Sequence, residues 1–225
     1  MVRAITTIVC SLLLLLSFSC SREDTGPQET IPGSGIVTFT AMTGQGETRS
    51  SQEGSFETGD AIGVFAIEPK TGVYWAVNNK YTYDGQKFKP ETEADNIIVT
   101  VGTDFDFYVY YPFKTGQTDI TGISHTAGNQ NEKAGWISAD FMTATYTDPI
   151  RNYTVPLHFK HRMSTVEVRI DRNDGVREAT MENVRRTSRF NLLTGGITTD
   201  ESRGSCTMHK YSETGGTTVF RVTIP

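Results

Sequence analysis

Alternation of apolar and polar side chains is the main periodic signal in this chain, and it is clearest over residues 105–111. The apolar positions there are Phe105, Phe107, Val109 and Tyr111. A period of two is typical of a half-buried β-strand. Proline ends such a run because it cannot donate a ladder hydrogen bond. We therefore predict a strand that stops before Pro112.

Comparable short runs recur along the chain. Further strands are expected at 36–42, 61–67, 96–101, 141–147, 206–211 and 217–224. Residues 61–67 have no polar side chain, which predicts burial on both faces. The Asp84-Gly85 pair lies between two strand-like segments and predicts a hairpin with a type I′ turn. Helical periodicity is weak, with one short helix expected near residues 138–142. The pattern predicts an all-β protein built as an antiparallel β-sandwich.

The longest apolar run changes parity partway along. From Tyr153 to Met163 the apolar residues are odd-numbered, whereas Val166, Val168 and Ile170 are even-numbered. One extra residue in a strand moves every later side chain to the other face. We predict a long strand that bends or bulges at Ser164-Thr165 between two sheets.

The first 19 residues have the pattern of a secretory signal peptide. Arg3 precedes a short apolar segment at 8–16, and small residues lead directly into Cys20. The apolar segment is too short to span a bilayer, which takes ~20 residues. A Cys at this place resembles a bacterial lipobox, in which Cys20 is acylated; the alternative is a plain signal peptide with a chance Cys. The next residues resemble a surface-export signal for lipoproteins: Ser21, Arg22, Glu23 and Asp24.

Composition divides the rest of the chain. Residues 20–35 are rich in Gly, Pro, Ser, Thr and Glu, and we expect a lipidated flexible tether. Residues 36–172 carry most of the strand pattern and form the predicted N-terminal β-sandwich domain. From Gly175 the chain is more charged, and residues 173–225 are predicted to form a partial C-terminal β domain.

Charge and cysteine content exclude several classes of function. The formal net charge is −5 at pH 7, which argues against nucleic-acid binding. Only Cys206 remains after the signal peptide and the lipidated Cys20, so no intrachain disulfide is expected. Cys206 is predicted to be a small buried apolar residue. No metal or other cofactor is expected.

Five ordered segments resemble the fimbrillin-like family, the lipoprotein pilins of Gram-negative anaerobes. The resemblance covers about residues 36–170, and its segments are 56–66, 79–88, 106–113, 138–142 and 155–168. It implies two tandem β-sandwich domains of Greek-key type and no catalytic activity. Family members usually continue well beyond the strand that corresponds to 217–225. This departure puts a complete second domain in question.

The resemblance also implies a mode of assembly. Family pilins are exported as lipoproteins, cut after an Arg and joined by a strand from the next subunit, which is β-augmentation. Arg49 is the candidate cleavage site because it lies in a polar, Gly-rich segment; the alternative is an ordinary loop arginine. Arg22 is a weaker candidate, because cleavage there would leave the first strand in place. The displaced strand would be Ile36, Val37, Thr38, Phe39, Thr40, Ala41 and Met42.

Other residues admit a second function. Tyr74, Trp75 and Trp136 could stack on sugar rings, although core packing of these aromatics is the simpler interpretation. His158 and His161 would face opposite sides of a strand, which disfavours a metal site. Asp60 is expected to shape a turn rather than to act as a catalytic carboxylate.

The sequence thus predicts a surface-exposed outer-membrane lipoprotein that acts as a structural or adhesive subunit of fimbriae. Its expected partners are other fimbrial subunits, the outer membrane through the lipid, and a host or bacterial adhesion ligand. The alternative is a surface lipoprotein that does not polymerise, either a pilus anchor or a glycan-binding protein. An enzyme is not expected.

Overall fold

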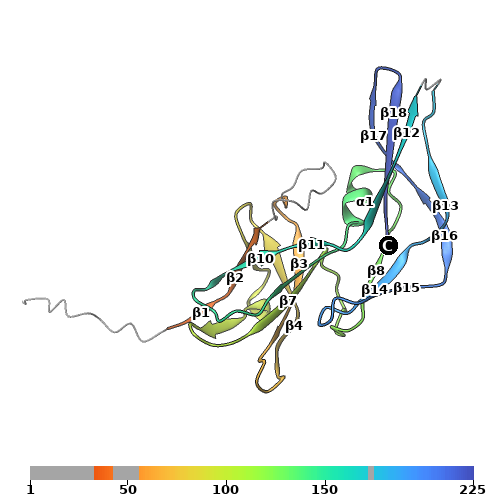
Figure 1. The fold of residues 1–225 in the computed structure, drawn as a ribbon. Coiled ribbons are helices and arrows are strands. Elements are labelled where there is room, and N and C mark those ends of the chain that lie inside the picture. The colour runs from red at the N-terminus through yellow and green to blue at the C-terminus, as the bar shows by residue number, and fades with distance from the viewer. Residues whose placement is uncertain (1–32, 43–55, 172–174) are drawn as a thin grey trace, which may run out of the picture. The chain divides into compact units, whose positions relative to one another are not determined.

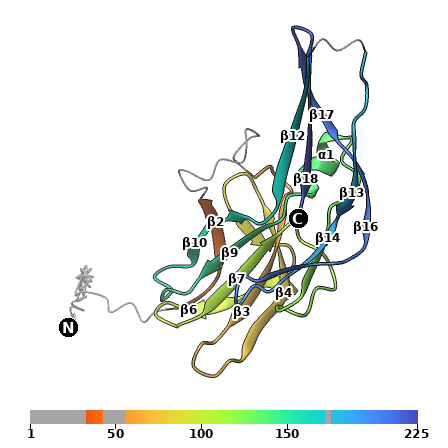
Figure 2. The ribbon, with the colours of Figure 1, turned by 45° about the vertical axis from the view of Figure 1, so that its right-hand side comes forward.

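An eight-stranded sheet with strand order β10-β2-β5-β4-β3-β7-β9-β11 forms the centre of the fold (Figures 1 and 2). The computed structural model describes residues 33–42, 56–171 and 175–225. Residues Pro32–Pro225 form one compact unit. The strands of this sheet are β2 (Thr38–Met42), β3 (Ala61–Ile67), β4 (Tyr74–Tyr83), β5 (Phe88–Pro90), β7 (Asp106–Tyr111), β9 (Met142–Tyr146), β10 (Thr154–His158) and β11 (Lys160–His161).

Both faces of the sheet are covered at β3, as its unbroken apolar pattern predicted. Ile62, Val64 and Ala66 belong to the main core on one face, which we call the inner face. Phe65 belongs to a second cluster on the opposite, outer face, together with Tyr110 of β7. The alternation within each strand therefore supplies two separate cores.

The inner face is enclosed because the two edges of the sheet approach each other and because a separate two-stranded sheet covers it. β10 contacts β9, and β1 (Ser34–Ile36) pairs with β6 (Ile98–Thr100). The main core is rich in aromatic side chains, including Phe39, Phe88 and Phe107, which are all fully buried. The all-β, mainly antiparallel prediction is confirmed. The β2–β10 pair is an exception because it is parallel.

Three smaller sheets contain the remaining strands. One is β12 (Ser164–Asp171), β18 (Thr217–Ile224) and β17 (His209–Thr214), in that order; another pairs β13 (Thr180–Arg185) with β16 (Arg203–Thr207). The third has the order β15 (Ile197–Thr199), β14 (Thr187–Phe190) and β8 (Ile123–Thr126). The helical elements are η1 (Glu93–Asp95) and α1 (Lys133–Ser138).

The prediction of one continuous long strand from Tyr153 is wrong. It is divided into β10 and β11, which lie at opposite edges of the eight-stranded sheet, and β12, which pairs with β18. The predicted change of sheet near Ser164 is confirmed, since β12 begins there (Figure 1). The chain passes from one edge strand to the other between β10 and β11, and it leaves the sheet before β12. Its backbone pairing is interrupted at both places.

Two local predictions also need correction. The Asp84-Gly85 hairpin is confirmed, but its loop has four residues between the paired Tyr83 and Phe88, and only Gly85 has a positive φ, of 100°. Type I′ needs positive φ at both central residues, so the predicted turn type is wrong. The short helix is α1, several residues before the predicted 138–142, because the buried Trp136 anchors it.

The predicted boundary between residues 172 and 173 is crossed by strand pairing. β12 precedes it and pairs along its whole length with β18, and β8 pairs with β14. The division into an N-terminal and a partial C-terminal domain stays a prediction. The ladders show that residues 164–171 hydrogen-bond with the C-terminal strands.

Candidate strand-exchange site

The segment from Gly33 to Met42 forms the first described part of the chain and enters the main core with every second side chain. Val37 and Phe39 are fully buried, and Ala41 packs against the same cluster. Ile36 and Met42 are 45% and 48% exposed. The segment predicted as the displaced strand therefore has one face in the core and one face in solvent.

Phe39 is the main apolar contact of this segment. Its ring packs edge-to-face on Tyr81 at 5.0 Å and on Phe107 at 5.3 Å, measured between ring centroids. The Tyr81 hydroxyl accepts a hydrogen bond from the Ile97 amide at 3.3 Å. Burial raises the pKa of Tyr81 far above its ordinary value. Phe39 thus lies in a dry pocket that would be open if β2 were absent.

Backbone hydrogen bonds hold the segment mainly from one side. β2 pairs with β10 at five positions, from Thr38↔Thr154 to Met42↔His158, but with β5 only at Phe39↔Phe88. Val37 interrupts the segment because its amide donates to the Ile97 carbonyl at 2.9 Å. The predicted strand 36–42 is therefore two strands with different partners, β1 on β6 and β2 on β10.

Tyr153 holds the beginning of the segment. Its hydroxyl donates to the Gly33 carbonyl, and its carbonyl accepts the Thr38 amide at 2.7 Å. A Cβ atom on Gly35 would lie 2.8 Å from the Tyr153 ring, so this close approach needs glycine. The sequence pattern predicts Tyr153 only as part of a strand. Its partners are more than a hundred positions away, and no local pattern indicates them.

The chain re-enters the described structure at Phe56, which is buried in an aromatic cluster. Its ring lies 5.0 Å from Phe88, 5.3 Å from Tyr111 and 5.0 Å from Phe159, all edge-to-face. This cluster fixes the position of the chain immediately after residues 43–55. Arg49, Cys20 and the export residues Ser21, Arg22, Glu23 and Asp24 lie outside the described residues.

The three aromatic residues considered for sugar stacking have different environments. Tyr74 is 46% and Trp75 is 58% exposed, and Trp75 contacts Phe105 edge-to-face at 5.1 Å. Trp136 is 6% exposed and is stacked on His209 at 5.3 Å. Tyr74 and Trp75 are therefore the members of the set that face solvent.

The polar candidates have structural roles. His161 hydrogen-bonds to Asp140 at 2.8 Å through Nδ1, and Asp60 accepts from the Glu57 amide at 2.8 Å and from the Tyr111 hydroxyl at 3.1 Å. Cys206 is buried, and burial raises the pKa of its thiol. In the described ranges, no group of His, Cys, Asp and Glu side chains could hold a metal ion. Neither helical element in those ranges has the length and hydropathy to cross a membrane.

Known structures share this fold at low sequence identity. A putative cell adhesion protein from Bacteroides ovatus is 18% identical, with 85% of this chain and 78% of that chain covered and a TM-score of 0.62. A putative cell adhesion protein from Bacteroides uniformis is 20% identical, with coverages of 83% and 75% and a TM-score of 0.56. No functionally curated protein matches the sequence significantly.

The sequence itself matches a family model described as fimbrillin-like. The match extends from residue 48 to residue 225, which is well over half of the chain. It includes every described strand from β3 to β18, whereas β1 and β2 lie before it. On this evidence the chain belongs to the fimbrillin-like family.

Proposed function

We propose that this chain is a structural or adhesive subunit of cell-surface fimbriae, exported as a lipoprotein acylated at Cys20. Cleavage after Arg49 would remove the lipid together with β1 and β2, and a strand from another subunit would take their place. Membership of the fimbrillin-like family supports the fimbrial or adhesin-like role. The Cys20 and Arg49 steps rest on the sequence pattern.

One observation carries the strand-exchange step. The segment that contains β1 and β2 contributes Val37, which lies between the two strands, and Phe39 of β2 to the core, yet all of it lies between Cys20 and Arg49 in the sequence. A single cut at Arg49 would therefore release an integral core strand. The cut chain would begin at Ser50, and Phe56 is anchored by its own aromatic contacts.

Removal of the segment would leave a groove suited to another strand. Backbone groups of β10 and of Ile97 would lose their partners, and the pocket around Tyr81 and Phe107 would lose Phe39. Unpaired backbone gives affinity for an added strand, and alternate pockets give its register. Such a contact joins unlike surfaces, and a contact of that kind extends into a fibre where its rotation does not close into a ring.

The test is the N-terminus and mass of the protein sheared from intact cells. A chain that begins at Ser50 and forms ladders on unboiled gels supports the proposal. The variant Arg49→Gln should keep its acylated Cys20, stay with membranes and form no ladders. The matched variant Arg151→Gln removes an exposed arginine from another loop and should be processed normally. A wild-type chain that keeps Cys20 on the cell surface contradicts the polymerising role.

The exposure of Tyr74 and Trp75 favours a second candidate function. Tyr74 and Trp75 of β4 each expose an aromatic ring on which a sugar ring could stack, one on each side of the strand. A surface lipoprotein that binds glycans would retain Cys20 and remain a monomer. The same mass measurement separates the two functions, and polysaccharide binding by that monomer would support the second.

A further inference from the structure

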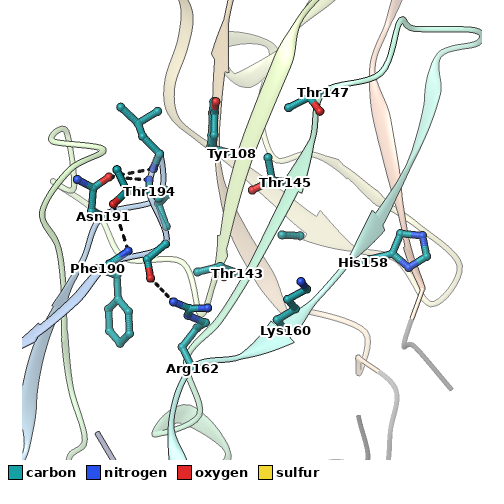
Figure 3. A pocket seen from close by; sticks show the side chains of 15 residues that line it. Tyr108, Thr143, Thr145, Thr147, His158, Lys160, Arg162, Phe190, Asn191 and Thr194 are labelled. Atoms are coloured by element: carbon teal, nitrogen blue, oxygen red, sulfur yellow. Dashed lines mark hydrogen bonds between the residues drawn. The ribbon is translucent and has the colours of Figure 1, made fainter. Parts of the chain in front are cut away.

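A groove of about 570 Å³ lies on the outer face of the eight-stranded sheet, at the edge of the segment 190–196 (Figure 3). This volume is within the ~300–1,000 Å³ range of small-molecule sites. The groove is separate from the inner face that β2 completes. We call it the outer groove.

Strand register builds one wall of the outer groove. Thr143 of β9 is paired with Lys160 of β11, and Thr145 is paired with Tyr108 of β7. Paired residues and alternate residues of a strand point to the same side of a sheet. Thr143, Thr145, Lys160 and Tyr108 consequently share the outer face, as Figure 3 shows.

The opposite wall is a turn that hydrogen bonds hold in place. The Asn191 side-chain oxygen accepts the amides of Leu193 at 3.0 Å and Thr194 at 3.2 Å. Arg162 donates through Nη2 to the Gly195 carbonyl, which joins the turn to the chain after β11. The groove is therefore bounded by fixed elements on both sides.

The charge in the groove is opposite to that of the chain. None of the fifteen described residues that line it is Asp or Glu, whereas Lys160 and Arg162 both line it. The whole chain has 26 acidic and 21 basic residues, so the lining is more basic than the chain as a whole. The Lys160 ammonium has no ion-pair partner among the described residues.

Hydroxyl groups supply the rest of the polar lining. Thr143 and Thr145 of β9 and Thr147 just after it form a row, and none of these hydroxyls has a hydrogen-bond partner in the described part of the chain (Figure 3). Tyr108 is half-buried, and this burial, with a smaller contribution from Asp106, raises the pKa of its hydroxyl, which stays protonated. The lining thus offers two cations, several donor hydroxyls and an aromatic ring.

We infer that the outer groove binds an anionic oligosaccharide, a sugar chain whose rings carry carboxylate or sulfate groups. Lys160 and the remaining guanidinium donors of Arg162 would bind the acidic group. The threonine row would hydrogen-bond the sugar hydroxyls, and Tyr108 would lie against a ring. Charge-assisted hydrogen bonds of this kind are the strong ones in such sites. This inference does not depend on cleavage or strand exchange.

The experiment is calorimetric titration of the folded chain with trigalacturonic acid, a chondroitin sulfate tetrasaccharide and neutral galactotriose. We expect at least one acidic sugar to bind, with affinity that falls as salt increases. The neutral trisaccharide should bind at least about tenfold more weakly, since it has no acidic group to accept charge-assisted hydrogen bonds from Lys160 and Arg162. Inorganic sulfate serves as the anion without a sugar.

Matched variants assign binding to the groove. Lys160→Gln should weaken binding of the acidic sugar about tenfold. Lys70→Gln removes an equal charge from a lysine whose side chain is 78% exposed, outside the groove, and should leave binding unchanged. Thr145→Val keeps the side-chain shape and should weaken binding without altering the salt dependence. Because Arg162 also supports the turn, Arg162→Lys is the variant to use there.

Several results would overturn the inference. They are failure of both acidic sugars to bind, equal binding of the neutral trisaccharide, and unchanged binding by Lys160→Gln. Displacement of the acidic sugar by sulfate at equal concentration would show an anion site without sugar recognition, which also overturns it. None of these results depends on whether the protein polymerises, so a failure here is distinct from a failure of the proposed function.

Discussion

β2 and β18 both place side chains in an apolar core, yet they are held in different ways. β18 lies between two neighbours, with eight paired positions on β12 and five on β17, whereas β2 has five on β10 and one on β5. β2 is fixed mainly by an aromatic pocket around Phe39. A strand that is held by side-chain pockets and one ladder can be replaced by a strand with the same pattern, whereas a central strand cannot be removed without loss of its sheet.

Side-chain hydrogen bonds, which we call polar clamps, also hold β18 and add to its difference from β2. Gln130 is fully buried; its amide nitrogen donates to the Thr223 carbonyl at 2.7 Å, and its oxygen accepts the Thr223 amide at 2.8 Å. Arg221 donates to Glu167 at 2.8 Å and lies over the Tyr211 ring at 3.6 Å. The apolar cluster to which β18 contributes is small, with four buried residues in the described part of the chain. These polar contacts supply stabilisation that a larger core would otherwise give.

The largest expected effect is at the pocket of β2. Phe39→Ala should lower the free energy of unfolding by about 3–5 kcal/mol, because it empties a fully buried aromatic site. Urea unfolding followed by fluorescence measures it. The matched change Met42→Ala, at a residue that is 48% exposed, should cost no more than about 0.5 kcal/mol. Equal effects would mean that β2 is not held through its inner face.

The next effect sharpens the contrast at β18. Gln130→Ala leaves the buried amide and carbonyl of Thr223 without partners, which should cost about 2–4 kcal/mol and raise hydrogen exchange in β18. Gln117 makes the same pair of bonds to Ser124, at 3.0 and 3.1 Å, but is only half-buried. Gln117→Ala should therefore cost less, because water can replace its amide. If the two variants lose equal stability, burial is not what makes the Gln130 clamp strong.

A smaller effect concerns the entry to β1. Gly35→Ala places a methyl group 2.8 Å from the Tyr153 ring, and the ring must shift, at a cost of about 1–3 kcal/mol. Gly33→Ala is the control, because a Cβ atom there has nothing within 4 Å. Thermal unfolding of the two variants would separate them. An equally stable Gly35→Ala protein would show that the contact is dispensable.

The smallest effect is a pH dependence at β12 and β18. Hydrogen bonds from Arg169 and Arg221 lower the pKa of Glu167 below its ordinary value of 4.5. Because the folded pKa is depressed, the stabilisation is present above the unfolded value and is lost as pH falls through the folded one. The partly solvated pair should contribute no more than about 1 kcal/mol.

The variant Glu167→Gln isolates this contribution. Urea midpoints of the wild type should fall between about pH 5 and pH 3 by more than those of the variant. The two proteins should approach each other at the acid end, since the carboxyl is protonated there. Parallel pH curves would contradict a role for Glu167 in holding β18.

Local patterns predicted the strands but not their partners. The buried nature of 61–67, the hairpin at Asp84-Gly85 and the change of sheet near Ser164 all followed from neighbouring residues. The parallel β2–β10 pair, the Tyr153–Gly33 bond and the Gln130–Thr223 clamp join residues 93 or more positions apart. Such contacts depend on how the sheets close, and a single sequence carries no periodic signal for them. The outer groove is of the same kind, since β9, β11 and residues 190–196 form it together.

The order of contacts at the start of the chain determines how the molecule would bear tension. A pull from the N-terminal side of Gly33 would reach the Tyr153–Gly33 bond and the β1–β6 ladder before it reached β2. β1 would detach first under tension, and the Phe39 pocket would not bear the load until then. A subunit tethered by Cys20 would then keep β2 in its sheet under shear. Only a cut beyond Met42 would allow that strand to leave without a pulling force.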